Sequence, residues 1–158
     1  MPNQFQRFLA VIEALNQFDV EYVLVGGVAV ILHGLERLTR EIAIFIKAIP
    51  ENVHRLKKAL HSIFNDPSID EITAEDLESY AVIRYGTPNG FYIDIMTQLG
   101  ETFSFQDLEY ETIAYGTVKI KIATPETLFK MKNDSLRLQD KADALFLQDM
   151  IHQRRSNQ

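Results

Sequence analysis

The stretch VLVGGVAVILHGLERLTREIAIFIK, at residues 23–47, constrains the fold of this chain more than any other. Its pattern predicts a strand, a tight turn at Gly26 and Gly27, a short helix that ends at Gly34, a loop, and a second strand over residues 42–46. The second strand is nearly all apolar, which indicates a sheet covered on both faces. Because glycine has no side chain, backbone N–H groups at such a turn can approach a phosphate closely. The stretch therefore predicts a phosphate-binding turn within an α/β sheet.

The rest of the chain continues this mixture of helices and strands. With 158 residues, 46% of them apolar, the chain is long enough for one domain over residues 1–158 with a core of its own. The order of the elements predicts an α/β fold in which one sheet is flanked by helices. Helices are expected over residues 3–17, 28–33 and 138–152 and from Pro50 and Pro125 onward, and strands over residues 21–25, 42–46, 80–85, 91–96 and 117–122.

Two other segments carry specific expectations. Residues 65–79 are acidic and rich in turn residues, so we expect them to form a solvated connection. The last helix is expected to turn Ala142, Leu145, Phe146 and Met150 toward the core, because these residues recur at roughly helical spacing.

Composition excludes several classes of protein. The chain has no cysteine, so disulfides and thiolate metal sites are excluded. No apolar run approaches the roughly 18 residues of a membrane span, and the N-terminal MPNQFQRF lacks the pattern of a signal peptide, so a cytoplasmic location is expected. The net charge of −6 argues against broad electrostatic binding to nucleic acid, although Arg37, Arg40 and Lys47 leave room for a local basic groove.

Acidic residues close to the glycine turn predict a metal site that is incomplete. Glu41 opens the second strand, and Asp94 lies in the middle of a later strand, where acidic residues are uncommon. We expect the two carboxylates to face each other across adjacent strands and to hold Mg²⁺ or Mn²⁺, since hard divalent metals prefer carboxylate oxygens. Residue 43 would point to the same side as residue 41, but Ala43 has no oxygen to offer.

The run GGVAVILHGLERLTREIAI, followed by the acid of FYIDIM, resembles the nucleotidyltransferase signature of the polymerase-β-like superfamily. It is most similar to the AbiEii-type, toxin-like nucleotidyltransferases, in which a His-Gly and an Arg-x-Thr follow the glycine pair. The C-terminal PETLFKMKNDSLRLQDKADALFL resembles the closing motif of that group. The matching residues are Gly26, Gly27, Ala29, His33, Gly34, Arg37, Thr39, Asp94, Lys132, Asp140, Lys141 and Asp143.

This resemblance implies a nucleotidyltransferase-type mixed β-sheet flanked by helices and a metal-assisted transfer of a nucleotide from an NTP to an acceptor. The implied acceptor is a tRNA or a protein hydroxyl, and the implied partner is a cognate toxin or antitoxin. The resemblance gives Asp140 or Asp143 a role in orienting the acceptor. It assigns nucleotide binding to Gly26, Gly27, Arg37, Thr39 and Lys132, and catalysis to Glu41, the position of Ala43, Asp94, Lys132 and Asp140.

The chain departs from the family at its acids. The family carries aspartate at both positions of the acidic pair, where this chain has Glu41 and Ala43. Two hypotheses follow: an enzyme whose site is impaired, or a degenerate module that binds a nucleotide or a partner without transferring anything. Binding of Mg²⁺ is expected to be weak in either case, because too few carboxylates are present. If the chain were active as written, Glu36 and Glu111 would be the first candidates for the missing oxygen.

Some site residues have a second interpretation. Arg37 is expected to hold a phosphate or to pair with Glu36 or Glu41. Lys132 and Asp140 could form an ordinary surface ion pair, which would contribute little to stability. His33 lies before a glycine at a helix end, which favours a packing or capping role over a ligand role.

Overall fold

The computed structural model describes residues 3–99, 103–133 and 137–157 of the chain. Its centre is a mixed sheet of six strands in the order β3-β4-β2-β1-β8-β7. Strand β1 runs parallel to β8 and β2 runs parallel to β4, whereas the other neighbours are antiparallel. The strands are β1 Tyr22–Val25, β2 Glu41–Ile46, β3 Val82–Gly86, β4 Tyr92–Met96, β7 Tyr110–Tyr115 and β8 Val118–Ala123, with β5 Gln98–Leu99 and β6 Phe103–Ser104 in a separate ribbon.

Helices α1 (Gln4–Gln17) and α3 (Pro50–Phe64) cover one face of the sheet. Phe8 of α1 and Phe64 of α3 both pack edge-on against Phe91, which begins the run of buried residues on that face of β4. Ile93 and Ile95 follow at alternate positions and are fully buried. The even-numbered residues of β4 therefore face the opposite side of the sheet, where the acids lie.

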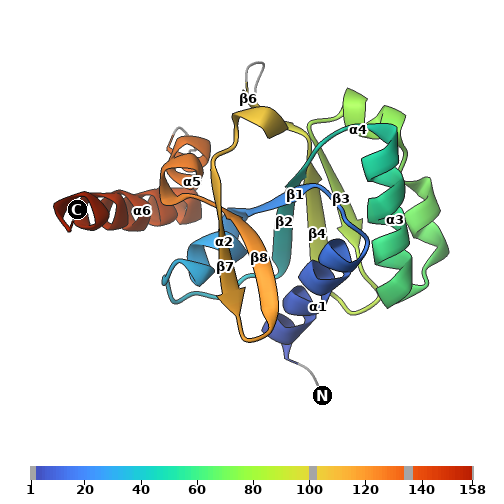
Figure 1. Ribbon diagram of the computed structural model, residues 1–158, viewed down its shortest axis with the longest axis horizontal. Coiled ribbons are helices and arrows are strands. Elements are labelled where there is room, and N and C mark those ends of the chain that lie inside the picture. The colour runs from blue at the N-terminus through green and yellow to red at the C-terminus, as the bar shows by residue number, and fades with distance from the viewer. Residues whose placement is uncertain (1–2, 100–102, 134–136, 158) are drawn as a thin grey trace.

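Helices α2 (Gly26–Leu32), α5 (Pro125–Lys132) and α6 (Leu138–Ser156) form a second group. Figure 1 shows them together at the side of the molecule away from α3, with α6 extending to the C-terminus. Helix α5 begins as its sequence predicts, because Thr124 caps it and a proline occupies its first turn. No described helix is long and apolar enough to cross a membrane. The mixed sheet flanked by helices confirms the predicted fold class.

The structure corrects the interpretation of residues 65–79. They contain a 3₁₀ turn at Pro67–Glu71 and the helix α4 at Ala74–Ser79 rather than a solvated connection. Ile69, Ile72 and Leu77 are buried in the main core. These three apolar residues anchor a segment in which acidic and turn-forming residues are frequent, so the charge of the segment did not predict its packing.

The structure also contains one strand that was not predicted, and it corrects the predicted inward face of the last helix. Strand β7 was not predicted, because Tyr110 and Tyr115 leave half of this edge strand exposed and its sequence has no strong apolar alternation. On α6, the side chains that face inward include Asp143 and Leu147 rather than Ala142 and Leu145. Phe146 and Met150 are half-buried. The buried face of α6 carries Ala144, Leu147 and Ile151 together with the carboxylate of Asp143, and a count of apolar residues does not reveal this charged member.

Candidate functional site

Strand pairing brings the predicted acids together. Ala43 on β2 lies opposite Asp94 on β4, and Glu41 comes two residues before Ala43 on the same face. The exposed fraction of the side chain is 30% for Glu41 and 15% for Asp94. The expectation that Glu41 and Asp94 face each other across adjacent strands is confirmed. Ala43 lies between them, directly beside Asp94, where a third carboxylate would complete the set.

Arg84 on β3 binds both acids. It lies opposite Asp94 in the antiparallel β3–β4 pair. Its Nε donates to Oδ1 of Asp94 at 2.8 Å, and its Nη2 donates to Oδ2 of Asp94 at 3.1 Å and to Oε2 of Glu41 at 2.5 Å. Since both acceptors bind one nitrogen, Oε2 and Oδ2 are at most about 5.6 Å apart. The hydrogen bond and charge of Asp94, with a smaller effect of Glu41, raise the pKa of Arg84, so it stays protonated.

The glycine pair packs against the site with no room for side chains. Gly26 has a φ of +70°, and a Cβ on it would lie 2.8 Å from the Cβ of Ala43. A Cβ on Gly27 would lie 2.4 Å from Nη2 of Arg37. Gly26 is therefore required by close approach and by its left-handed backbone conformation, whereas a Cβ on Gly27 would have to displace the end of the Arg37 side chain.

We expect Gly26→Ala to lower the free energy of unfolding by about 2 kcal/mol or more, through its left-handed φ and its contact with Ala43. Gly90→Ala is the matched control, since Gly90 has a φ of +86° and open space around it. For Gly90→Ala we expect the free energy of unfolding to fall by about 1 kcal/mol, because only the left-handed φ disfavours a side chain there. Urea unfolding followed by circular dichroism measures both, and adding Ala43→Gly to Gly26→Ala should recover part of the loss. Equal losses for the two single variants would contradict the contact.

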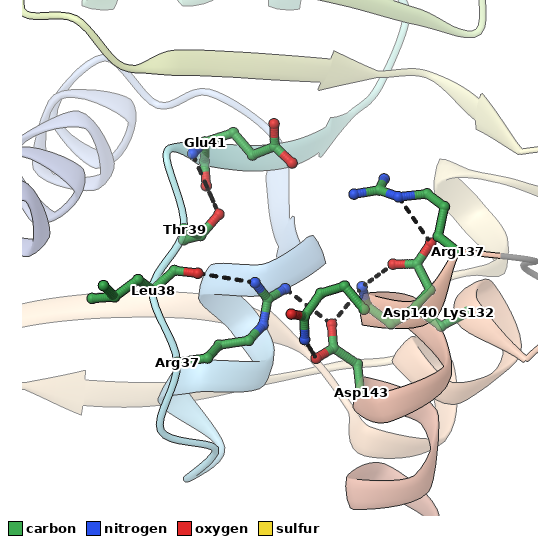
Figure 2. A network of polar contacts seen from close by, with 9 residues as sticks. Arg37, Leu38, Thr39, Glu41, Lys132, Arg137, Asp140 and Asp143 are labelled. Carbon is green, nitrogen blue, oxygen red and sulfur yellow. Dashed lines mark hydrogen bonds and ion pairs between the residues drawn. The ribbon is translucent and has the colours of Figure 1, made fainter.

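A second group of charges surrounds Asp143, whose side chain is fully buried. Nη2 of Arg37 donates to Oδ2 of Asp143 at 3.0 Å, and Nζ of Lys132 lies 2.9 Å from the same oxygen. Lys132 also donates to Oδ1 of Asp140 at 3.1 Å, while Gln139 donates to Asp143. Figure 2 shows this network, with Arg37 reaching it from the segment before β2 and Glu41 lying across from Lys132 and Asp140.

This network corrects the expected ion-pair partners of Arg37 and the expected surface pair of Lys132 and Asp140. Arg37 pairs with Asp143 rather than with Glu36 or Glu41. Lys132 is buried, and its contact with Asp140 belongs to a network rather than to an isolated surface pair. Both cations line the same cleft as the acids, and their contact with a phosphate stays a prediction.

Other residues named from the sequence have structural roles. The hydroxyl of Thr39 donates to the carbonyl of Glu41 at 3.2 Å and thereby holds the start of β2. His33 caps the end of α2, and its Nε2 lies 2.9 Å from the carbonyl of Ala123, which confirms the packing and capping interpretation. Glu111 binds Arg154 and faces His33 instead of the acids.

The two groups line one cleft of about 330 Å³. The glycine pair forms one wall, the strand acids a second, and the ends of α5 and α6 a third. The sequence predicted these three parts from motifs far apart in the chain, and the cleft is where they meet. Its lining includes Gly26, Gly27, Arg37, Glu41, Ala43, Asp94, Lys132, Arg137 and Asp140.

The side chains present do not fit a pair of divalent metals. The carboxylates of Glu41 and Asp94 point at the place where the metals would lie, but Arg84 already binds three of their four oxygens. Ala43 has no side-chain oxygen to add. Mg²⁺ requires near-ideal octahedral coordination by oxygen. Among the described residues, no group of three or more His, Cys, Asp or Glu could hold a metal ion. The Mg²⁺ or Mn²⁺ cofactor therefore stays a prediction that the donor set does not favour.

Solved structures share this architecture over nearly the whole chain. The lincomycin-bound crystal structure of the lincosamide antibiotic adenylyltransferase LnuA superposes with a TM-score of 0.56 at 19% sequence identity, covering 92% of this chain and 96% of LnuA. This chain has the nucleotidyltransferase fold. An antigenic nucleotidyltransferase-like protein from Paracoccidioides brasiliensis superposes with a TM-score of 0.59 at 15% identity, covering 91% and 75% of the two chains. The candidate nucleotidyltransferase TM1012 of Thermotoga maritima gives 0.50 at 16%, covering 95% and 94%.

At these identities the nucleotidyltransferase fold is established, and the activity is a separate question. No protein-family model matches the sequence, and no curated protein matches it either. The AbiEii-type assignment and the toxin–antitoxin partner stay predictions.

Proposed function

We propose that the cleft binds a nucleoside triphosphate and that the chain is a nucleotidyltransferase-type protein whose transfer activity is weak as its sequence stands. One observation carries this proposal. A single cleft joins the glycine pair, the acids Glu41 and Asp94, and the Lys132–Asp140 pair, which lie far apart in the sequence. On a fold shared with nucleotidyltransferases, that combination suits a nucleotide better than any other small ligand.

The phosphates would lie between the glycine turn and the cations at the ends of α5 and α6. Gly26 and Gly27 line the cleft and carry no side chains of their own, so a phosphate would be able to approach their backbone closely. Arg37 and Lys132 supply further donors, and Asp143 fixes their positions beneath the cleft. Because Asp143 also neutralises part of their charge, we expect them to contribute directed hydrogen bonds more than excess charge.

Weak transfer follows from the acid side of the cleft. Ala43 gives no oxygen where a carboxylate would lie beside Asp94, and Arg84 engages the two acids that are present. The same observation supports the alternative function, a module that binds a nucleotide or a toxin–antitoxin partner without catalysis. Under the transfer hypothesis, Asp140 would orient the acceptor. The acceptor classes to test are a tRNA, a protein hydroxyl and, because LnuA is named for an antibiotic, a small-molecule hydroxyl.

Binding of the four ribonucleoside triphosphates, measured by calorimetry, tests the nucleotide site. Lys132→Gln should weaken binding at least tenfold, since a hydrogen bond to a charged group contributes roughly 1.5–3 kcal/mol. Lys130→Gln is the matched control, because Lys130 lies on the same helix but is exposed and outside the cleft. Circular dichroism should show that both variants are folded. Failure of the wild-type chain to bind any of the four nucleotides, with or without Mg²⁺, would end the proposal.

A further inference from the structure

Arg84 holds the position between the two acids with three hydrogen bonds. It binds both oxygens of Asp94 and one oxygen of Glu41. Its guanidinium carbon also lies 4.9 Å from the centre of the Tyr92 ring, on the same face of the sheet. A planar fork bound to a carboxylate at two points and stacked on a ring is well suited to keep one geometry.

The strand register explains why Arg84 reaches the acids. Ala43, Asp94 and Arg84 form one row across β2, β4 and β3, so their side chains emerge on one face. In this row Ala43 carries no charge, and Arg84 carries a positive charge beside Asp94. Both features reduce the need for an external cation beside Asp94.

We propose that Arg84 takes the place of a divalent metal between Glu41 and Asp94, so that the cleft binds its nucleoside triphosphate without a metal. This inference rests on the proposed nucleotide site. The guanidinium neutralises the acids as a cation would, and it occupies the oxygens through which Mg²⁺ would have to bind. Two bare carboxylates at this position would instead repel the phosphates.

Nucleotide affinity in the presence and absence of metal tests this inference. The dissociation constant of each triphosphate is measured for the wild-type chain and for Arg84→Gln, once with millimolar Mg²⁺ and once with a chelator. For the wild type we expect the two dissociation constants to agree within about twofold, because the acids offer Mg²⁺ no free pair of oxygens. For Arg84→Gln we expect the metal-free affinity to fall about tenfold or more and to recover partly in Mg²⁺, since the freed carboxylates then repel phosphate unless a cation is added.

Arg155→Gln is the matched control for net charge, because Arg155 is exposed near the end of α6 and outside the cleft. It should behave as the wild type under both conditions. Arg84→Lys should show an intermediate metal dependence, because a lysine keeps the charge but cannot bind two carboxylates in a fork.

Metal binding without nucleotide gives a second readout that does not depend on the nucleotide site. Titration of Mn²⁺ followed by electron paramagnetic resonance should show no tight site in the wild type and a new one in Arg84→Gln combined with Ala43→Asp. Wild-type nucleotide binding that strengthens tenfold in Mg²⁺ would overturn the inference while leaving the nucleotide site intact. An Arg84→Gln chain indistinguishable from the wild type in both titrations would overturn it as well.

Discussion

Replacing Asp143 with alanine is expected to lower the free energy of unfolding by about 3–5 kcal/mol, the usual cost of leaving buried charges without their partner. The carboxylate is fully buried and holds Arg37 from one part of the chain and Lys132 from another. Those two side chains are only 16% and 10% exposed, so water cannot fully replace the lost partner. Urea unfolding followed by circular dichroism measures the change.

Asp149→Ala is the matched control for Asp143→Ala. Asp149 lies on the same helix, is exposed, and contacts only Gln153 among the interactions described for its side chain. Its removal should change stability by no more than about 0.5 kcal/mol. If the two variants unfold at the same urea concentration, the buried network does not anchor α6 to the rest of the protein.

Combining Glu41→Asp with Ala43→Asp is expected to raise transfer of labelled nucleotide to an acceptor by at least about 10–100-fold, the range associated with gain or loss of a metal partner. Residue 43 faces the cleft beside Asp94, so an aspartate there adds the third carboxylate. Adding Arg84→Gln should raise transfer further, because it frees the oxygens of Asp94 and Glu41. The assay uses ATP, GTP, CTP and UTP with tRNA, protein and small-molecule acceptors.

Ala43→Asn, in the same Glu41→Asp background, separates charge from size. Asparagine has nearly the volume of aspartate but carries no negative charge, so this variant should remain as weak as the wild type. Equal activity of the asparagine and aspartate variants would show that the added charge is not what matters. Full activity of the unchanged chain would show that Ala43 is not a lost ligand position.

The sequence predicted those parts of the site that depend on local rules. The glycine turn, the strand with Glu41 and the mid-strand position of Asp94 all follow from spacing and strand periodicity, and the structure brings these residues together. Arg84 was missed. The predicted strands over residues 80–85 and 91–96 would pair residue 84 with residue 92 if they met symmetrically, whereas the register of the structure pairs Arg84 with Asp94. Because the strand bounds did not give the register, they did not show that an arginine lies opposite the mid-strand acid.

The network around Asp143 could not be predicted in the same way. Whether Asp143 or Ala142 faces inward depends on the rotation of α6, and apolar spacing along that helix is weak. The inward-facing Asp143 is paired with cations from two other elements, Arg37 and Lys132, whose positions emerge only when the chain is folded. Contacts over more than 100 residues of sequence, such as that between Arg37 and Asp143, leave no local pattern.

The contact between Gly26 and Ala43 has a consequence for the history of the site. Because the missing side chain of Gly26 makes room for the Cβ of residue 43, the fold constrains that carbon and leaves the atoms beyond it free to enter the cleft. Any alanine codon becomes a codon for an acidic residue by one base change. A lineage that carries this chain can therefore lose or regain the third carboxylate in one mutational step, without rebuilding the surrounding core.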